Sequence, residues 1–278
     1  MERSQRLPSG QVLPTLRILE ARDVRLHEDA DPHRVTALAV RLQQEDVLRN
    51  PPIGAPLPGG GFVILDGANR TTALRSIGVP FHLLQIVEYE TPEIRLDVWH
   101  HLLREDEAVL GSLPQEQVVT LSDRVELEQR LGDGALACGL VTEAGVFGLP
   151  GGRDLAARIG TLRRVVASYA GRTPIYRVPT ADLEGLRADF DRVGVIVVFP
   201  HFSKAEILKL ADLQEKLPAG ITRHVIPNRA LRVNLPLDVL RGPGTAAEKN
   251  AALADLIHAR LLAHRIRAYP EATVVFDD

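Results

Sequence analysis

Hydrophobic residues recur along the chain at the spacings of short strands and amphipathic helices. Val35, Leu38 and Leu42 fall on one face of a helix that begins at Pro32. Asp31 is the expected N-cap of this helix, because its carboxylate can accept hydrogen bonds from the first free backbone N–H groups. Further helices are predicted over residues 70–77, 92–103, 118–131, 154–169, 182–193, 203–216 and 246–266. Strands are predicted over residues 12–19, 62–65, 81–87, 135–140, 145–149, 194–199, 221–226, 230–233 and 272–276.

The order of these elements predicts an α/β fold. Over about the first 105 residues a helix, a strand, a loop, a second helix and a second strand follow one another, which is typical of one compact α/β unit. The middle third instead combines helices with a hairpin that turns at residues 143–145. The chain has 278 residues, which is enough for one large domain or two small ones.

Composition and charge narrow the classes of function. The formal net charge is −3, so no overall basic field holds nucleic acid, and nucleic acid is not an expected partner. Cys138 is the only cysteine, which excludes a disulfide within the chain and a thiolate metal cluster. No apolar run reaches the length of a membrane span, and residues 1–11 lack the apolar core of a signal peptide. We therefore expect a cytoplasmic protein without a membrane partner.

The loop after the strand at residues 62–65 is the strongest candidate for chemistry. A strand followed by an Asp-Gly turn and a helix start presents backbone N–H groups that favour a bound phosphate. Asp66, at the carboxyl end of the strand, can hold Mg²⁺ or accept a hydroxyl group, and Arg70 can bind two phosphate oxygens. The predicted phosphate-binding residues are Asp66, Gly67, Ala68, Asn69, Arg70, Thr71 and Thr72. A plain Asp-Gly turn that caps a helix is an equally good interpretation of the spacing alone.

Two long stretches resemble a known superfamily. LHEDADPHRVTALAVRLQQEDVLRNPPI, followed by GFVILDGANRTTALRSIGVP, resembles the N-terminal domain of ParB-like partition proteins. Within that superfamily, the HE-D-x-D-P start and the later ITRHVIPNRALRVNLPL segment resemble the free serine kinases most. Those enzymes make O-phospho-L-serine from free serine, with ATP or ADP as phosphoryl donor. The resemblance covers about residues 20–105 and residues 200–241.

The resemblance implies a fold and a division of the chain. The implied fold is α/β, with a ParB/sulfiredoxin-like N-terminal core and an additional small α+β lobe. Residues 1–110 would form the nucleotide-binding core and residues 111–199 the small lobe. Residues 200–278 would pack on the core and complete the substrate site, and serine would bind in the cleft between the lobes.

The resemblance also implies roles for particular residues. Glu28 corresponds to the catalytic glutamate that acts as general base, and residues 66–70 correspond to the nucleotide phosphate loop, with Mg²⁺ as cofactor. Many relatives carry histidine where this chain has Ala68 or Asn69, so a proton-shuttling histidine is absent here. Without the resemblance, Glu28 would be read as part of a solvated acidic loop. Replacing Arg70 with alanine is expected to weaken nucleotide binding and to change stability little.

A free amino acid needs a cation for its carboxylate and acceptors for its ammonium group. The predicted serine-binding residues are Trp99, Thr222, Arg223, His224 and Arg229, with Glu28 or Asp66 facing the ammonium group. The other interpretation of residues 222–229 is a strand whose polar side chains point into solvent.

Residues 99–101 are predicted to lie on a helix, as a core tryptophan followed by two surface histidines. Trp99 could instead form a wall of the serine pocket. His201, which follows a buried strand, is a weaker candidate for the site.

Three other functions fit parts of the pattern. A ParB-like transcription regulator or partition-type DNA-binding protein would carry a helix-turn-helix after residue 105, and none is evident. A sulfiredoxin-like enzyme would need a reactive cysteine in the phosphate loop, whereas Cys138 lies in the predicted hairpin. A non-catalytic nucleotide-binding partner in biosynthesis stays open.

Overall fold

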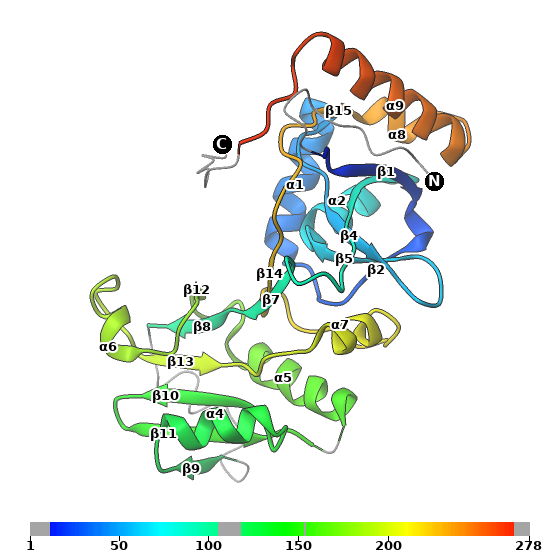
Figure 1. Ribbon diagram of the computed structural model, residues 1–278. Coiled ribbons are helices and arrows are strands. Elements are labelled where there is room, and N and C mark those ends of the chain that lie inside the picture. Colours follow the sequence, from blue (N-terminus) through cyan, green and yellow to red (C-terminus); the bar gives the residue numbers. More distant parts are fainter. Residues whose placement is uncertain (1–11, 105–117, 153, 270–278) are drawn as a thin grey trace.

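A five-stranded and a six-stranded β-sheet organise the chain (Figure 1). The computed structural model describes residues 12–104, 118–152 and 154–269. The first sheet has the strand order β1-β6-β4-β5-β2, and the second has the order β12-β8-β13-β10-β11-β9. The predicted α/β fold is confirmed.

The first sheet forms the upper body in Figure 1, together with four helices. Its strands are β1 (Thr15–Glu20), β2 (Val24–Leu26), β4 (Ile53–Pro56), β5 (Phe62–Asp66) and β6 (Phe81–Ile86). The helices are α1 (Pro32–Glu45), α2 (Ala68–Ser76), α8 (Leu237–Arg241) and α9 (Ala246–Leu262), and the short strands β3 (Val47–Leu48) and β15 (Leu235–Pro236) pair beside them. Asp31 caps α1 as predicted, because its side chain accepts hydrogen bonds from the backbone N–H groups of His33 and Arg34.

The second sheet forms the lower body and lies between two helices. Its strands are β8 (His100–Leu103), β9 (Val119–Leu121), β10 (Leu136–Thr142), β11 (Gly145–Pro150), β12 (Tyr176–Val178) and β13 (Val195–Val198). Along β13, Val195 and Val197 pack with residues of α5 (Leu155–Tyr169), whereas Ile196 and Val198 pack with residues of α4 (Arg124–Gly132). The strand at residues 194–199 is therefore buried on both faces, as its unbroken apolar run predicts.

A two-stranded ribbon links the bodies. β7 (Arg95–Val98) pairs antiparallel with β14 (Thr222–Val225), and α7 (Lys204–Leu210) lies near their junction. One hydrophobic cluster contains Val63 of the first sheet and Leu140 of the second, so the two bodies share part of their core. The predicted division of the chain at residues 110 and 199 stays a prediction.

Several predicted elements are wrong. Residues 92–103 form β7 and β8 instead of a helix, and residues 230–233 form no strand. The partners of β7 and β8 lie more than 70 residues further along the chain, so local spacing could not reveal the pairing. His100 and His101 are consequently buried, whereas the helix prediction placed them on the surface.

Other boundaries differ less. Residues 182–193 form only the short helix α6 (Leu183–Leu186), and residues 118–131 divide into β9 and α4. α7 has the capping box expected from Ser203 and Glu206 but ends at Leu210. The strand predicted over residues 272–276 lies outside the described residues.

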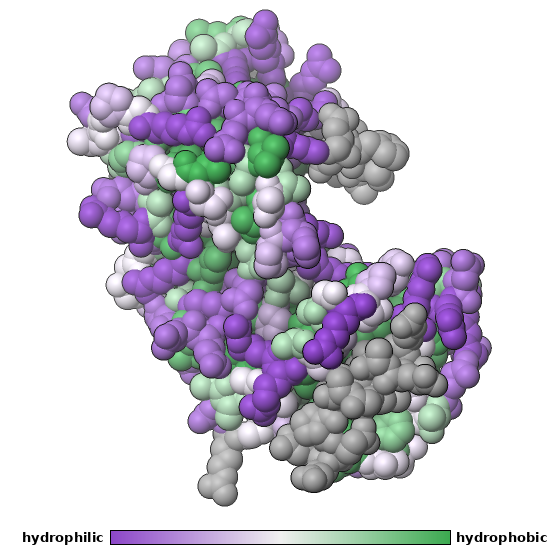
Figure 2. All heavy atoms as spheres, turned by 180° about the vertical axis from the view of Figure 1, so that it is seen from behind, coloured by the Kyte–Doolittle hydropathy of each residue, from purple (hydrophilic) through white to green (hydrophobic). Residues whose placement is uncertain are grey.

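The surface is predominantly hydrophilic on the face that Figure 2 shows, with smaller hydrophobic areas between polar side chains. Among the described residues, no helix combines the length and apolarity that crossing a membrane requires.

Candidate active site

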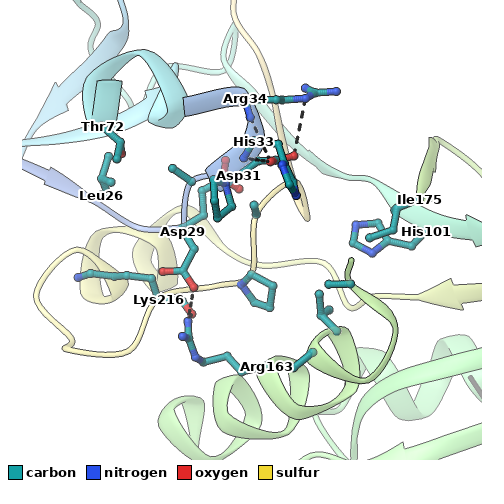
Figure 3. Close-up of a pocket in the computed structure, with 18 of the residues that line it drawn as sticks. Leu26, Asp29, Asp31, His33, Arg34, Thr72, His101, Arg163, Ile175 and Lys216 are labelled. Carbon is teal, nitrogen blue, oxygen red and sulfur yellow. Dashed lines mark hydrogen bonds and ion pairs between the residues drawn. The ribbon is translucent and has the colours of Figure 1, made fainter. Parts of the chain in front are cut away.

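A cleft of about 1220 Å³ opens between the two bodies. One wall comes from residues 25–34, which run from β2 into α1. The other comes from α5, from residues 175–177 at β12 and from residues 216–219. Figure 3 shows Asp29 opposite Arg163 of α5, with His101 of β8 and Ile175, which precedes β12, facing the same space. Asp29 and Arg163 form an ion pair across the cleft.

Glu28 lies on this cleft and is held by backbone pairing on both sides. The N–H of Asp29 donates to the carbonyl of Leu217 at 2.7 Å, and the N–H of Leu217 donates to the carbonyl of His27 at 3.1 Å. This bridge joins the strand-to-helix loop of the first body to the segment that precedes β14. The carboxylate of Glu28 is therefore placed by main-chain contacts and keeps part of its surface open to the cleft.

The surroundings of Glu28 make it a base suited to neutral pH. Burial raises its pKa to about 7, whereas a hydrogen bond donated by Thr222 and the nearby Arg177 charge would each act in the opposite direction. Oε2 of Glu28 lies 2.9 Å from Oγ1 of Thr222. General bases work best when their pKa lies near the operating pH, so this carboxylate can accept a proton from a hydroxyl group at pH 7.

Glu28 and Thr222, both predicted site residues, thus lie in contact. Thr222 in turn contacts His27, which the sequence analysis did not identify. His27 is 1% exposed, with Nε2 at 2.8 Å from Oγ1 of Thr222 and Nδ1 at 2.7 Å from the carbonyl oxygen of Ile64. Burial lowers the pKa of His27 to about 4. Its position beside Glu28 in the sequence was the only signal that could have pointed to it.

The Asp66 loop has the predicted strand–turn–helix geometry. Gly67 has φ 95° and is the N-cap of α2, and a Cβ atom there would lie 3.0 Å from Pro52. Glycine is therefore required at this turn. Oδ1 of Asn69 accepts a hydrogen bond from the backbone N–H of Asp31 at 2.8 Å, which ties the start of α2 to the start of α1.

Two threonines of the loop have hydroxyl groups without partners. Oγ1 of Thr71 and Oγ1 of Thr72 are buried and make no hydrogen bond within the described part of the chain. Thr72 also lines the cleft, whereas Ala68 is buried. Buried hydroxyl groups normally have hydrogen-bond partners, so the N-terminal part of α2 can still form hydrogen bonds with a ligand.

Asp66 lies between two arginines. Oδ2 of Asp66 accepts a hydrogen bond from Nη2 of Arg70 at 2.9 Å and also pairs with Arg229. Asp66 and Arg229 belong to the two segments that the sequence analysis expected to meet, so the loop and residues 221–229 do lie side by side.

Arg70 has a structural role in addition to its predicted one. Its Nη1 donates to the carbonyl oxygens of Asn50 at 3.0 Å and Pro51 at 3.3 Å, while Nη2 is bonded to Asp66. These contacts lead us to revise the expectation that its removal would change stability little, because the side chain joins α2 to the loop before β4.

We expect Arg70→Ala to reduce the free energy of unfolding by about 2 kcal/mol, since a charged donor to three acceptors is lost. Urea denaturation of the protein without ligand measures this. Arg124→Ala is the matched control, because within the described part of the chain Arg124 makes one ion pair, of 3.7 Å with Glu128, on a helix surface. Equal midpoints for Arg70→Ala and wild type would contradict the structural role.

The other predicted serine-binding residues are engaged elsewhere. The guanidinium of Arg223 lies 4.4 Å from the ring centroid of Trp99 and 3.9 Å from Asp97. His224 is buried, with Nε2 at 2.8 Å from the hydroxyl of Tyr89, and burial holds its pKa well below the usual range. Of the predicted site residues, only Glu28 and Thr72 are among the described residues that line the cleft. The roles predicted for the others stay predictions: Asp66, Gly67, Ala68, Asn69, Arg70, Thr71, Trp99, His201, Thr222, Arg223, His224 and Arg229.

Arg177 of β12 is a cleft residue that the sequence analysis did not identify. Its guanidinium packs against Gly220, where a Cβ atom would lie 2.1 Å from Cζ. It acts electrostatically on Glu28 and makes no hydrogen bond or ion pair with any other described residue.

His101, which is paired with Arg177 across β8 and β12, lines the same cleft. Its Nδ1 lies 2.7 Å from the Tyr169 hydroxyl, and its buried Nε2 makes no hydrogen bond of normal geometry with a described residue. Burial, the charge of Arg177 and His100 lower the pKa of His101 to about 3, and the backbone of Gly220 acts in the opposite direction. Arg177 lies on the short strand β12, which the sequence analysis did not predict, and His101 lies on the buried strand β8, which it predicted as a helix, so the sequence pointed to neither residue.

Sequence comparison finds relatives along most of the chain. It is 23% identical over 231 residues to the ATP-dependent L-serine kinase SbnI of Staphylococcus aureus, covering 81% of this chain and 84% of the relative. It is 22% identical over 236 residues to the ADP-dependent L-serine kinase SerK of Thermococcus kodakarensis, covering 82% of this chain and 96% of the relative. No family model matches the chain.

Solved structures share the fold. C-terminally truncated SbnI from Staphylococcus aureus superposes with a TM-score of 0.69 at 20% identity, covering 88% of this chain and 96% of the other. A free serine kinase in complex with AMP superposes with a TM-score of 0.69 at 21% identity, covering 85% and 95%. The predicted resemblance to free serine kinases is confirmed in both sequence and fold.

Proposed function

We propose that this chain, which resembles the free serine kinases over most of its length, phosphorylates free L-serine to O-phospho-L-serine with ATP or ADP as donor. The observation that supports this best is the position of Glu28. It is a carboxylate with a pKa near 7, held by main-chain bonds in the cleft between the two bodies and joined to Thr222. A kinase that acts on an alcohol needs a base of this kind beside a phosphate-binding helix terminus.

The proposed reaction uses few groups. The serine hydroxyl binds beside Glu28 and loses its proton to that carboxylate as the bond to phosphorus forms. The bond between the transferred phosphorus and the bridging oxygen of the nucleotide breaks, and the shortened nucleotide leaves with that oxygen. The residues of the Asp66 loop hold the nucleotide phosphates with the backbone N–H groups at the start of α2 and the free hydroxyl group of Thr72.

Mg²⁺ is part of the proposal, although the residues present do not form a resident magnesium site. The described residues contain no group of three or more carboxylate, histidine or cysteine side chains that could hold a metal ion. The charge of Asp66 is also neutralised by Arg70 and Arg229. Mg²⁺ would enter with the nucleotide, held by phosphate oxygens and by Asp66, and would offset phosphate charge.

Arg177 is the proposed partner of the serine carboxylate. The predicted cations Arg223 and Arg229 already pair with Asp97 and Asp66, and His224 is buried and neutral. Arg177 lies near Glu28 on the wall opposite the first body and forms no hydrogen bond or ion pair with another residue that the structure describes. A serine whose hydroxyl meets Glu28 can extend its carboxylate toward this guanidinium, which binds two oxygens in one plane.

The direct test is an assay for O-phosphoserine. Protein, Mg²⁺ and L-serine are incubated with ATP or with ADP, and the products are separated by mass spectrometry. We expect O-phosphoserine with at least one donor, and the relatives include enzymes of both kinds. No product with either donor, together with salt-dependent binding to random DNA, would favour the DNA-binding alternative.

A further inference from the structure

A chain of short contacts runs from Glu28 into the protein interior. Oε2 of Glu28 lies 2.9 Å from Oγ1 of Thr222, which lies 2.8 Å from Nε2 of His27, whose Nδ1 lies 2.7 Å from the carbonyl oxygen of Ile64. Thr222 is 9% exposed and His27 1% exposed, so both side chains are shielded from bulk water. The number of hydrogens available along it can therefore be counted.

The count starts at Ile64. A carbonyl oxygen only accepts hydrogen bonds, so Nδ1 of His27 carries a hydrogen. A neutral imidazole has one N–H group, which leaves Nε2 as an acceptor, and the Thr222 hydroxyl must donate to it. The hydroxyl has a single hydrogen, so only its lone pairs face Glu28. The contact between Thr222 and Glu28 is then a hydrogen bond only when Glu28 itself carries a proton.

The opposite direction of the Thr222 hydrogen bond, toward Glu28, requires a buried positive charge on His27. If Thr222 donated to an ionised Glu28, Nε2 of His27 would require its own hydrogen, and the ring would become an imidazolium. Lys216 opposes a positive charge on His27, and so does His224, whose ring centroid lies 5.4 Å from that of His27. The carbonyl of Ile64 favours the imidazolium. Around Glu28, Asp66 opposes ionisation, whereas a Thr222 donor, Arg177 and the backbone of Gly220 favour it. Burial of His27 tips the balance to the neutral ring.

We infer that His27, acting through the hydroxyl of Thr222, strengthens Glu28 as a base by presenting it with a hydrogen-bond acceptor in place of a donor. When Glu28 is ionised, its carboxylate receives no hydrogen bond from Thr222. When Glu28 is protonated, its carboxyl group donates a hydrogen bond to the Thr222 hydroxyl. Glu28 thus holds the proton taken from the substrate hydroxyl more tightly. His27 and Thr222 are positioning residues in this scheme, and their effect on rate rests on the proposed function.

The test is the pH dependence of kcat/KM for serine in wild type and in His27→Asn. An asparagine amide can still donate to the Ile64 carbonyl but is too short to accept from Thr222, so the hydroxyl is released to donate to Glu28. We expect the acidic limb of the profile to move to lower pH by about half to one unit. Thr222→Ser keeps the hydroxyl, so the acidic limb of its profile is expected to stay at the wild-type pH. His82→Asn is the matched control, because His82 is also buried with a pKa lowered to about 4 but has no contact with Glu28.

A double variant shows whether the effect passes through Thr222. In a Thr222→Val background, the further change His27→Asn is expected to leave the acidic limb in place, because the connecting hydroxyl is already absent. An unshifted limb in His27→Asn alone, a shift to higher pH, or an equal shift in both backgrounds would overturn the inference.

A second measurement uses the wild-type protein and does not depend on enzyme activity. The ¹⁵N shifts of the His27 ring in the wild-type protein at pH 7 are expected to be those of the neutral form with hydrogen on Nδ1, and an imidazolium would overturn the inference. If no O-phosphoserine forms in the assay above, the proposed function fails, while these shifts still decide the arrangement of hydrogens.

Discussion

Replacing Glu28 with glutamine is expected to lower turnover by roughly 10²–10⁴-fold while nucleotide binding stays nearly unchanged. A serine hydroxyl is a weak nucleophile at pH 7, and its proton must leave as the bond to phosphorus forms. Glutamine keeps the shape of Glu28 and most of its hydrogen bonding but cannot accept that proton. Steady-state kinetics with saturating serine, together with calorimetric titration of the nucleotide, measure the two quantities separately.

Two neighbours of Glu28 serve as matched controls. Asp29→Asn removes the ion pair with Arg163, and Asp31→Asn keeps a capping side chain at the start of α1, so both remove one negative charge from the same loop. We expect losses far below that of Glu28→Gln. Equal losses in all three variants would indicate a general electrostatic effect, and near-normal turnover in Glu28→Gln would leave Asp66 as the next candidate base.

Stability gives an independent check on the burial of Glu28. Its pKa is raised from 4.5 to about 7 in the folded protein, so folding favours the protonated form. The stability that protonation contributes is fully present below pH 4.5 and is lost as the pH rises through 7. Glu28→Gln should therefore melt at a higher temperature than wild type at pH 8, and the difference should shrink toward pH 5.

The parts of the fold that depend on neighbours in the sequence could be predicted. Asp31 before Pro32, Gly67 after a short apolar strand, and Ser203 three residues before Glu206 each determine local geometry through their own backbone or capping bonds. The resemblance to the free serine kinases added Glu28, whose role the local sequence left open between a catalytic base and a solvated loop.

The parts that depend on distant pairing could not be predicted from spacing. β7 meets β14 more than 100 residues later, and Arg177 reaches the cleft only because β12 pairs with β8. His27 becomes a neighbour of Thr222 through the same long-range arrangement. These residues carry no local motif, so their proximity to Glu28 is a consequence of the tertiary fold.

Replacing Arg177 with methionine is expected to lower kcat/KM for serine by about 10- to 100-fold, since a charge-assisted bond to the carboxylate is lost. Methionine preserves the packing against Gly220, and KM for the nucleotide should change little. Wild type should also prefer L-serine over L-serinamide, which lacks the carboxylate, and Arg177→Met should lose most of that preference. Steady-state kinetics with each acceptor give the ratio. An increase in KM for the nucleotide with an unchanged ratio would assign Arg177 to the phosphates instead.

A glycine variant separates the position of Arg177 from its charge. In Gly220→Ala the new methyl group would lie 2.1 Å from Cζ of Arg177, so the guanidinium must move while its charge remains. Gly78→Ala is the matched control, because Gly78 has φ 71° against 77° at Gly220 but no atom within 4 Å of the added carbon. Both variants therefore bear the same backbone strain. We expect Gly220→Ala to reproduce much of the loss seen in Arg177→Met and Gly78→Ala to leave kcat/KM for serine unchanged. Equal kinetics for the two glycine variants would show that the placement of this guanidinium against Gly220 does not matter for serine.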